Sequence, residues 1–109
     1  MKILAIDDQQ LVLLPLEKRL TDLGYEVVIE TDAALGLKLY DEFHPDLVIV
    51  DFNMPRISGF DVVNHIRKSK QPETPIMILS GNTQDAIITE AFELGVTDYM
   101  KKPLSLNEI

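Results

Sequence analysis

The chain contains no cysteine, no tryptophan and no long apolar stretch. The absence of cysteine excludes disulfide bonds, zinc–thiolate sites and thiol catalysis, although it leaves the redox compartment undetermined. No apolar run approaches the ~18 residues of a membrane span. The short apolar run near the N-terminus is interrupted by Asp7 and Asp8, too early for a signal peptide. We therefore expect no membrane association, and a cytoplasmic location is the natural default.

Basic residues are scarce relative to acidic ones. Ten lysines and arginines stand against 18 aspartates and glutamates, which gives a formal net charge of −8. This balance argues against direct binding of nucleic acid or anionic lipid, both of which need a basic face. It suits a protein that binds a cation or a basic partner. The 109 residues fit a single domain, 1–109, and the 46% hydrophobic content is ordinary for a globular chain.

Short apolar runs alternate with helix-length segments along the chain. Strands are predicted at 3–6, 27–29, 47–50 and 76–79, with a weaker one at 96–100. Helices are predicted at roughly 10–23, 33–43, 59–69 and 84–94, with Gly24 and Gly95 as C-terminal caps. This order predicts an α/β fold with a parallel sheet and helices on both faces. Gly36 lies inside the second helix, where a close approach to the sheet would justify it.

Polar side chains follow the carboxyl ends of the predicted strands. Asp7 and Asp8 come after the first strand, Asp51 ends the third, Ser80 ends the fourth and Lys102 follows the fifth. In an open parallel sheet, the functional crevice lies beyond the carboxyl ends of the strands. We therefore expect three carboxylates, a hydroxyl and an ammonium group at one rim.

This set of side chains suits a cation and phosphoryl transfer. Clustered carboxylates repel one another unless a cation neutralises them, and hard oxygen ligands suit Mg²⁺. A carboxylate that faces a metal ion and a lysine can attack phosphorus and form an aspartyl phosphate. Together with Mg²⁺, Lys102 and the Ser80 hydroxyl are the donors needed to hold the phosphoryl oxygens.

These residues resemble the receiver domain of two-component response regulators. The segment from Asp51 to Gly59 looks like the one that follows the phosphorylated aspartate in that family, and the segment ending in Lys102 and Pro103 looks like its strand-five signature. The resemblance implies a flavodoxin-like, doubly wound five-stranded sheet of order 2-1-3-4-5. It also implies Mg²⁺ as cofactor, a histidine kinase or phosphotransfer protein as phosphodonor, and an output domain or protein as partner.

The resemblance assigns the catalytic and metal-binding positions. Asp51 would be the phosphoacceptor, and Lys102 would contact the phosphoryl group. Asp7, Asp8 and Asp51 would bind the metal ion together with the backbone carbonyl of Asn53. The protein would then assist its own phosphorylation and dephosphorylation, without turning over an external substrate.

The resemblance also assigns a conformational switch. Ser80 would move towards the phosphoryl oxygens, and Tyr99 would rotate inward into the space that Ser80 vacates. Pro103 would follow a cis peptide bond. The surface of the fourth helix and fifth strand would change, and with it the affinity for partners.

One departure from the family lies at the end of the chain. Residues 105–109 look like the first turn of a fifth helix, after which the chain stops. That helix would share a face of the sheet with the first helix, so we expect the apolar side of Leu13, Leu16 and Leu20 to be exposed. Either the chain is a truncated piece of a longer regulator, which we favour, or a partner or a second copy covers this surface in a dimer.

Other classes of function remain as alternatives. A receiver-like module that binds partners without phosphorylation is the first, although such a module would be expected to lose one of the key side chains. An aspartyl-phosphate phosphatase is the second, but Asn53 stands where such enzymes usually carry a second acid. A flavin-binding protein is disfavoured because Asp7 and Asp8 would repel the phosphate of the cofactor.

Overall fold

The computed structural model describes residues 1–81 and 84–102. In this part of the chain, five parallel strands form one sheet of order β2-β1-β3-β4-β5. The strands are β1 (Lys2–Ile6), β2 (Glu26–Glu30), β3 (Leu47–Asp51), β4 (Ile76–Ser80) and β5 (Asp98–Lys101). The helices that connect them are α1 (Gln10–Asp22), α2 (Ala33–Phe43), α3 (Gly59–Arg67) and α4 (Asp85–Glu93). The predicted fold class and strand order are confirmed.

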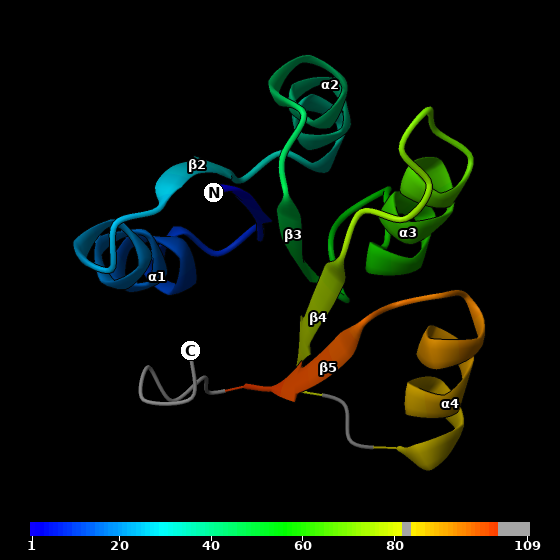
Figure 1. The fold of residues 1–109 in the computed structure, drawn as a ribbon. Helices are drawn as coiled ribbons and strands as arrows, with labels where there is room; N and C mark the ends of the chain where they lie inside the picture. Colours follow the sequence, from blue (N-terminus) through cyan, green and yellow to red (C-terminus); the bar gives the residue numbers. More distant parts are fainter. Residues whose placement is uncertain (82–83, 103–109) are drawn as a thin grey trace.

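The sheet separates two apolar layers. Helices α2, α3 and α4 cover one face, and α1 covers the other (Figure 1). Alternate residues of one strand serve the two layers, so Leu4 and Ile6 of β1 join the larger cluster while Ile3 and Ala5 join the smaller. Because both faces of β1 are buried, its sequence is a continuous apolar run rather than an alternating one.

The predicted exposure of Leu13, Leu16 and Leu20 is wrong. All three are buried, with 1–2% of their surface exposed. They lie on the side of α1 that packs against the centre of the sheet, where they join a cluster of β1, β3 and β4 residues, Ile3, Ala5, Ile49 and Leu79. These three leucines of α1 are thus packed on the sheet. On the same layer, Met77 and Met100 are half-buried.

The predicted elements differ from the observed ones mainly at their ends. Helix α3 ends at Arg67 rather than at 69, and β5 begins at Asp98 rather than at 96. Val96 is buried, but its N–H donates to the carbonyl of Ala91, so it closes α4 instead of opening the strand. The predicted bond at Pro103 and the predicted helix turn at 105–109 lie outside the described residues.

Gly36 marks the close approach of α2 to the sheet that its position in the helix predicts. A β-carbon at this position would lie 2.6 Å from Cδ1 of Ile6, the last residue of β1. Glycine lets the helix pack this closely on the Ile6 side chain, which would have to shift for a larger residue.

A hydroxyl network fixes the end of the molecule opposite the strands' carboxyl ends. The Tyr40 hydroxyl lies 3.0 Å from Ser69 Oγ and 3.0 Å from Thr74 Oγ1, and it donates to the carbonyl of Gln71 at 3.2 Å. Tyr40 and Thr74 are buried. The network joins the end of α2 to the α3–β4 loop.

None of the described helices is long and apolar enough to span a membrane.

Candidate functional site

The carboxyl ends of β1, β3, β4 and β5 meet along one edge of the sheet. Asp7 follows β1, Asp51 ends β3, Ser80 ends β4 and Lys102 follows β5. The register pairs Ile6 with Val50, Asp51 with Leu79 and Ser80 with Lys101, which sets these ends side by side. Residues that are distant in sequence therefore share one location, as the sequence predicts.

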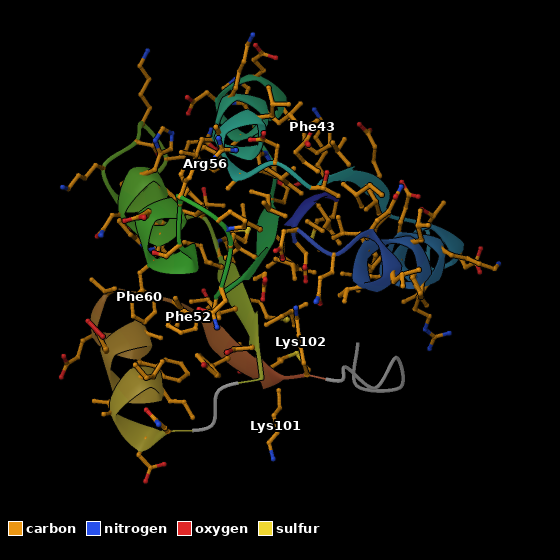
Figure 2. The ribbon with its side chains drawn as sticks, turned by 180° about the vertical axis from the view of Figure 1, so that it is seen from behind. Phe43, Phe52, Arg56, Phe60, Lys101 and Lys102 are labelled. Carbon is orange, nitrogen blue, oxygen red and sulfur yellow. The ribbon has the colours of Figure 1, made fainter. Side chains whose placement is uncertain are left out.

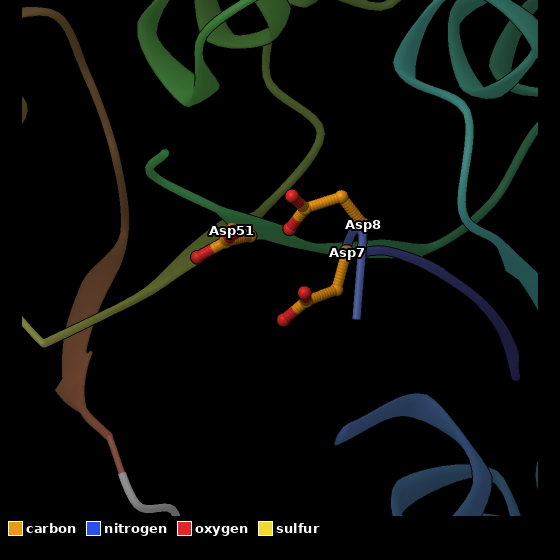
Figure 3. A group of neighbouring side chains, drawn as sticks. All are labelled: Asp7, Asp8 and Asp51. Carbon is orange, nitrogen blue, oxygen red and sulfur yellow. The ribbon is translucent and has the colours of Figure 1, made fainter. Parts of the chain in front are cut away.

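Three carboxylates gather at this edge (Figure 3). Asp7, Asp8 and Asp51 each offer an oxygen, and these oxygens all lie within 4.8 Å of one another. Asp7 and Asp51 are only 1% and 4% exposed, whereas Asp8 is exposed. The cluster is thus buried on the side of the sheet and open to solvent on the side of Asp8.

Lys102 supplies the positive charge that the two buried carboxylates face. Its Nζ lies 2.9 Å from Asp7 Oδ2 and 3.0 Å from Asp51 Oδ1, and its backbone N–H donates to the Ser80 carbonyl at 2.8 Å. Burial alone would lower the pKa of Lys102, but hydrogen bonds with Asp7 and Asp51 outweigh it, so the pKa is raised. The neighbouring Lys101 is exposed and points away from the site (Figure 2).

Asp51 is an unusual carboxylate. Burial raises its pKa from 3.8 to about 6, and the negative charge of Asp7 contributes to the increase. The hydrogen bond and the charge of Lys102 act in the opposite direction. Carboxylates with strongly shifted pKa values are concentrated at functional sites. Ionisation of Asp51 therefore costs more free energy than that of an ordinary carboxyl group, and a further positive charge nearby would reduce this cost.

Asp7 carries an oxygen that is suited to a metal ion. Its Oδ1 accepts a hydrogen bond from the backbone N–H of Gln9 at 2.9 Å. Its Oδ2 is buried and faces the Lys102 ammonium at 2.9 Å. A carboxylate oxygen has more than one lone pair, so Oδ2 can face Lys102 and still serve, with two further carboxylates, as a ligand for a hard divalent cation.

The start of α3 packs closely against the backbone of Asp51 and Phe52. A β-carbon on Gly59 would lie 2.6 Å from the Asp51 carbonyl oxygen and 2.9 Å from Cα of Phe52, so α3 can begin here only with glycine. The Gly59 N–H donates to the Phe52 carbonyl at 2.9 Å. Phe52 also packs on Phe60 of α3, with ring centroids 4.9 Å apart (Figure 2).

Three other predicted site residues lie in or directly after the strands that form this edge. Ser80 is buried at the end of β4. Asn53 is exposed, two residues after Asp51, and Tyr99 is half-buried in β5, packed against the larger apolar cluster. The metal-binding carbonyl of Asn53 and the switch roles of Ser80 and Tyr99 stay predictions.

Gln9 is a site residue that sequence reasoning missed. Its side-chain Oε1 lies 3.5 Å from Nζ of Lys102. A polar residue directly after the acidic pair was the available signal. It could not show that the side chain turns towards the site, because the contact joins residues 93 positions apart.

The doubly wound sheet, with an acidic cluster and a lysine at its carboxyl ends, places the molecule among flavodoxin-like α/β domains. The family of response regulator receiver domains matches residues 3–109. The chain therefore belongs to this family, and the resemblance noted in the sequence is confirmed. It is a receiver domain of the kind found in two-component response regulators.

Curated relatives cover nearly the whole chain. It is 40% identical over 110 residues to a probable transcriptional regulator ycf27 of Galdieria sulphuraria, covering 99% of this chain and 42% of that protein. It is 32% identical over 108 residues to the alkaline phosphatase synthesis transcriptional regulatory protein PhoP of Bacillus subtilis, covering 99% of this chain and 45% of that protein. The chain thus spans less than half the length of these relatives.

A solved structure confirms the architecture. Chemotaxis protein CheY4 of Vibrio cholerae superimposes with a TM-score of 0.91 at 32% identity, covering 97% of this chain and 89% of that one. The agreement extends to the parallel sheet and its helices.

Proposed function

We propose that this domain is a phosphorelay switch that accepts a phosphoryl group on Asp51. The observation that carries the proposal is the position of the Asp51 carboxylate, 3.0 Å from the Lys102 ammonium and clustered with Asp7 and Asp8. A nucleophile, a cationic donor and an acidic cation site are thereby combined at one open edge. A module that only binds partners would have no need for this costly arrangement of buried charge.

The phosphodonor would be a phosphohistidine on a histidine kinase or phosphotransfer protein. An oxygen of Asp51 attacks phosphorus, the new P–O bond forms, and the P–N bond breaks with its electron pair returning to the imidazole. The ionised form of Asp51 performs the attack, and this form predominates above its pKa of about 6. Lys102 lies close enough to Asp51 to exchange its contact with the carboxylate for one with the phosphoryl oxygens.

Asp7, Asp8, Asp51 and the backbone carbonyl of Asn53 would hold Mg²⁺. When bound, this ion would supply positive charge for the phosphoryl oxygens. The buried Oδ2 of Asp7 and the exposure of Asp8 support this assignment, since Oδ2 keeps a lone pair beside its contact with Lys102 and Asp8 gives an entry from solvent.

The output would be a change of the α4–β5 surface. Ser80, buried at the end of β4, would donate its hydroxyl to a phosphoryl oxygen, and half-buried Tyr99 would turn inward. The two packings differ in their affinity for an output domain or protein, and phosphorylation shifts their populations. Dimerisation through the surface beside α1 stays a prediction. We propose no turnover of an external substrate, because Asn53 replaces the second acid expected of a phosphatase.

The relatives' names refer to transcription, but direct DNA binding by this domain is not proposed. Its net charge of −8 opposes contact with phosphates. A regulator that contained it would bind DNA through another part of its chain, in the cytoplasm, while this domain received the signal.

Intact-mass measurement tests the proposal. The protein is incubated with acetyl phosphate and Mg²⁺, and we expect the mass gain of one phosphoryl group. Asp51→Asn should show no gain, and Asp46→Asn, an exposed aspartate at the opposite end of the sheet, should behave as the parent does. Addition of EDTA should prevent the gain. No gain on the parent protein would favour the alternative of a constitutive interaction module.

A further inference from the structure

Gln9 occupies an unusual position at the start of α1. Asp32 and Ser58 cap α2 and α3 with side-chain hydrogen bonds, but Gln9, the N-cap residue of α1, makes no such bond. Instead its backbone N–H donates to Asp7 Oδ1 at 2.9 Å. The backbone of Gln9 is thereby fixed to the acidic cluster, while its side chain remains available for another contact.

That contact is with Lys102. The ammonium group has three N–H donors, and the described residues place three acceptors around it. These are Asp7 Oδ2 at 2.9 Å, Asp51 Oδ1 at 3.0 Å and Gln9 Oε1 at 3.5 Å. Of the three acceptors, only Gln9 is uncharged, and its distance to the ammonium is the longest, so this contact is the weakest.

The three acceptors have different fates in the proposed reaction. Asp7 and Asp51 are also the residues proposed to bind Mg²⁺, and Asp51 loses its charge when it becomes an acyl phosphate. Both carboxylates therefore have competing partners during the reaction. The amide oxygen of Gln9 has neither role, so its contact with Lys102 can persist throughout.

We propose that Gln9 is a positioning residue that keeps the Lys102 ammonium at the phosphorylation site while the carboxylates are engaged. This inference rests on the proposed function. Gln9 acts through Lys102 and touches neither the phosphorus atom nor the metal ion. The structure supports this role because Gln9 is anchored at its backbone to one end of the site and reaches the lysine from the exposed side.

A matched pair of variants tests the contact itself. Gln9→Met keeps the length of the side chain and removes the acceptor, and Gln10→Met makes the same change at the exposed first residue of α1. The exchange of Lys102 ammonium protons with water is measured by ¹⁵N NMR, with Lys101 as an internal reference. We expect exchange at Lys102 to accelerate about threefold or more in Gln9→Met and to stay unchanged in Gln10→Met. Equal exchange in both variants would overturn the contact.

A kinetic cycle tests the consequence. At saturating Mg²⁺, Gln9→Met should slow phosphorylation by acetyl phosphate about threefold to tenfold, with the Mg²⁺ dissociation constant from calorimetry unchanged. In a Lys102→Ala background the same substitution should have no effect, because Gln9 acts through the lysine. An equal slowing in both backgrounds, or none in the parent, would overturn the role.

The two proposals fail in different ways. If the parent protein takes up no phosphoryl group, the proposed function fails. The ammonium exchange measurement still decides whether Gln9 holds Lys102, since it requires no phosphorylation.

Discussion

The Lys102 ammonium lies 3.0 Å from the Asp51 carboxylate, although β4 separates the strands that carry the two residues. Lys102 follows β5 and Asp51 ends β3, so the lysine side chain reaches past the end of β4, where Ser80 lies. The contact raises the pKa of the lysine and opposes the increase in the pKa of the aspartate. Charge compensation at the site therefore depends on the packing of three strands.

Replacement of this lysine should destabilise the metal-free protein. Lys102→Met removes the counter-ion of two buried carboxylates, and we expect the free energy of unfolding in EDTA to fall by about 2–3 kcal/mol. Mg²⁺ should recover part of the loss, because a bound cation replaces the missing charge. Urea denaturation with and without Mg²⁺ measures both effects. Lys101→Met, at an exposed neighbour, is the control, and equal stability of the two variants in EDTA would contradict the prediction.

The stability of the metal-free protein should depend on the ionisation of Asp51. The pKa of this residue is about 6 in the folded protein against an ordinary value of 3.8, so the folded state binds the proton more tightly than the unfolded state. Its contribution to stability is therefore present at low pH and is lost as the pH rises from about 4 to about 6.

Asp51→Asn should remove this pH-dependent loss. At neutral pH in EDTA, we expect the variant to be more stable than the parent by about 1–2 kcal/mol, and the difference should shrink below pH 4 or so. Thermal unfolding over a series of pH values provides the measurement. Asp22→Asn, at an exposed position of α1, controls for the substitution itself. If the difference in stability between Asp51→Asn and the parent does not vary with pH, the charge of Asp51 does not destabilise the folded protein.

Alanine should be harmful at Gly59 and harmless at Gly81. A β-carbon at Gly59 meets the backbone of Asp51 and Phe52 at 2.6 and 2.9 Å, whereas one at Gly81 meets nothing within 4 Å. Gly59→Ala should lower the free energy of unfolding by about 2 kcal/mol or more and slow phosphorylation, because α3 must move away from the phosphoacceptor. Gly81→Ala should do neither. Urea denaturation and intact-mass time courses distinguish the two sites.

The Tyr40 network should matter for stability but not for phosphorylation. Tyr40→Phe leaves Ser69, Gln71 and Thr74 without the shared hydroxyl, and we expect a loss of about 1–2 kcal/mol. The network lies at the end of the molecule opposite Asp51, so the rate of phosphoryl uptake should match that of the parent. A slower uptake would reveal energetic coupling between the two ends.

The sequence predicted the parts that depend on local pattern and on topology. The unalternating run of β1 indicated a central strand, and the rule for parallel sheets then placed Asp7, Asp51 and Lys102 together. The sequence did not predict the features that depend on how side chains pack in the folded protein. Burial of Leu13 depends on how α1 lies across the sheet, and the direction of the Gln9 side chain depends on a lysine at the other end of the chain.

Because Asp7 follows the first strand and Lys102 follows the last described one, Lys102 cannot compensate the charge of Asp7 until β5 has joined the sheet. A nascent chain that emerges from the ribosome can pair β1 with β2 and β3 while its carboxylates still repel one another. Such an unfinished chain lacks the lysine that phosphoryl capture would require. Competence to receive a signal would thus arise only when β5 joins the sheet, after the other described strands have been made.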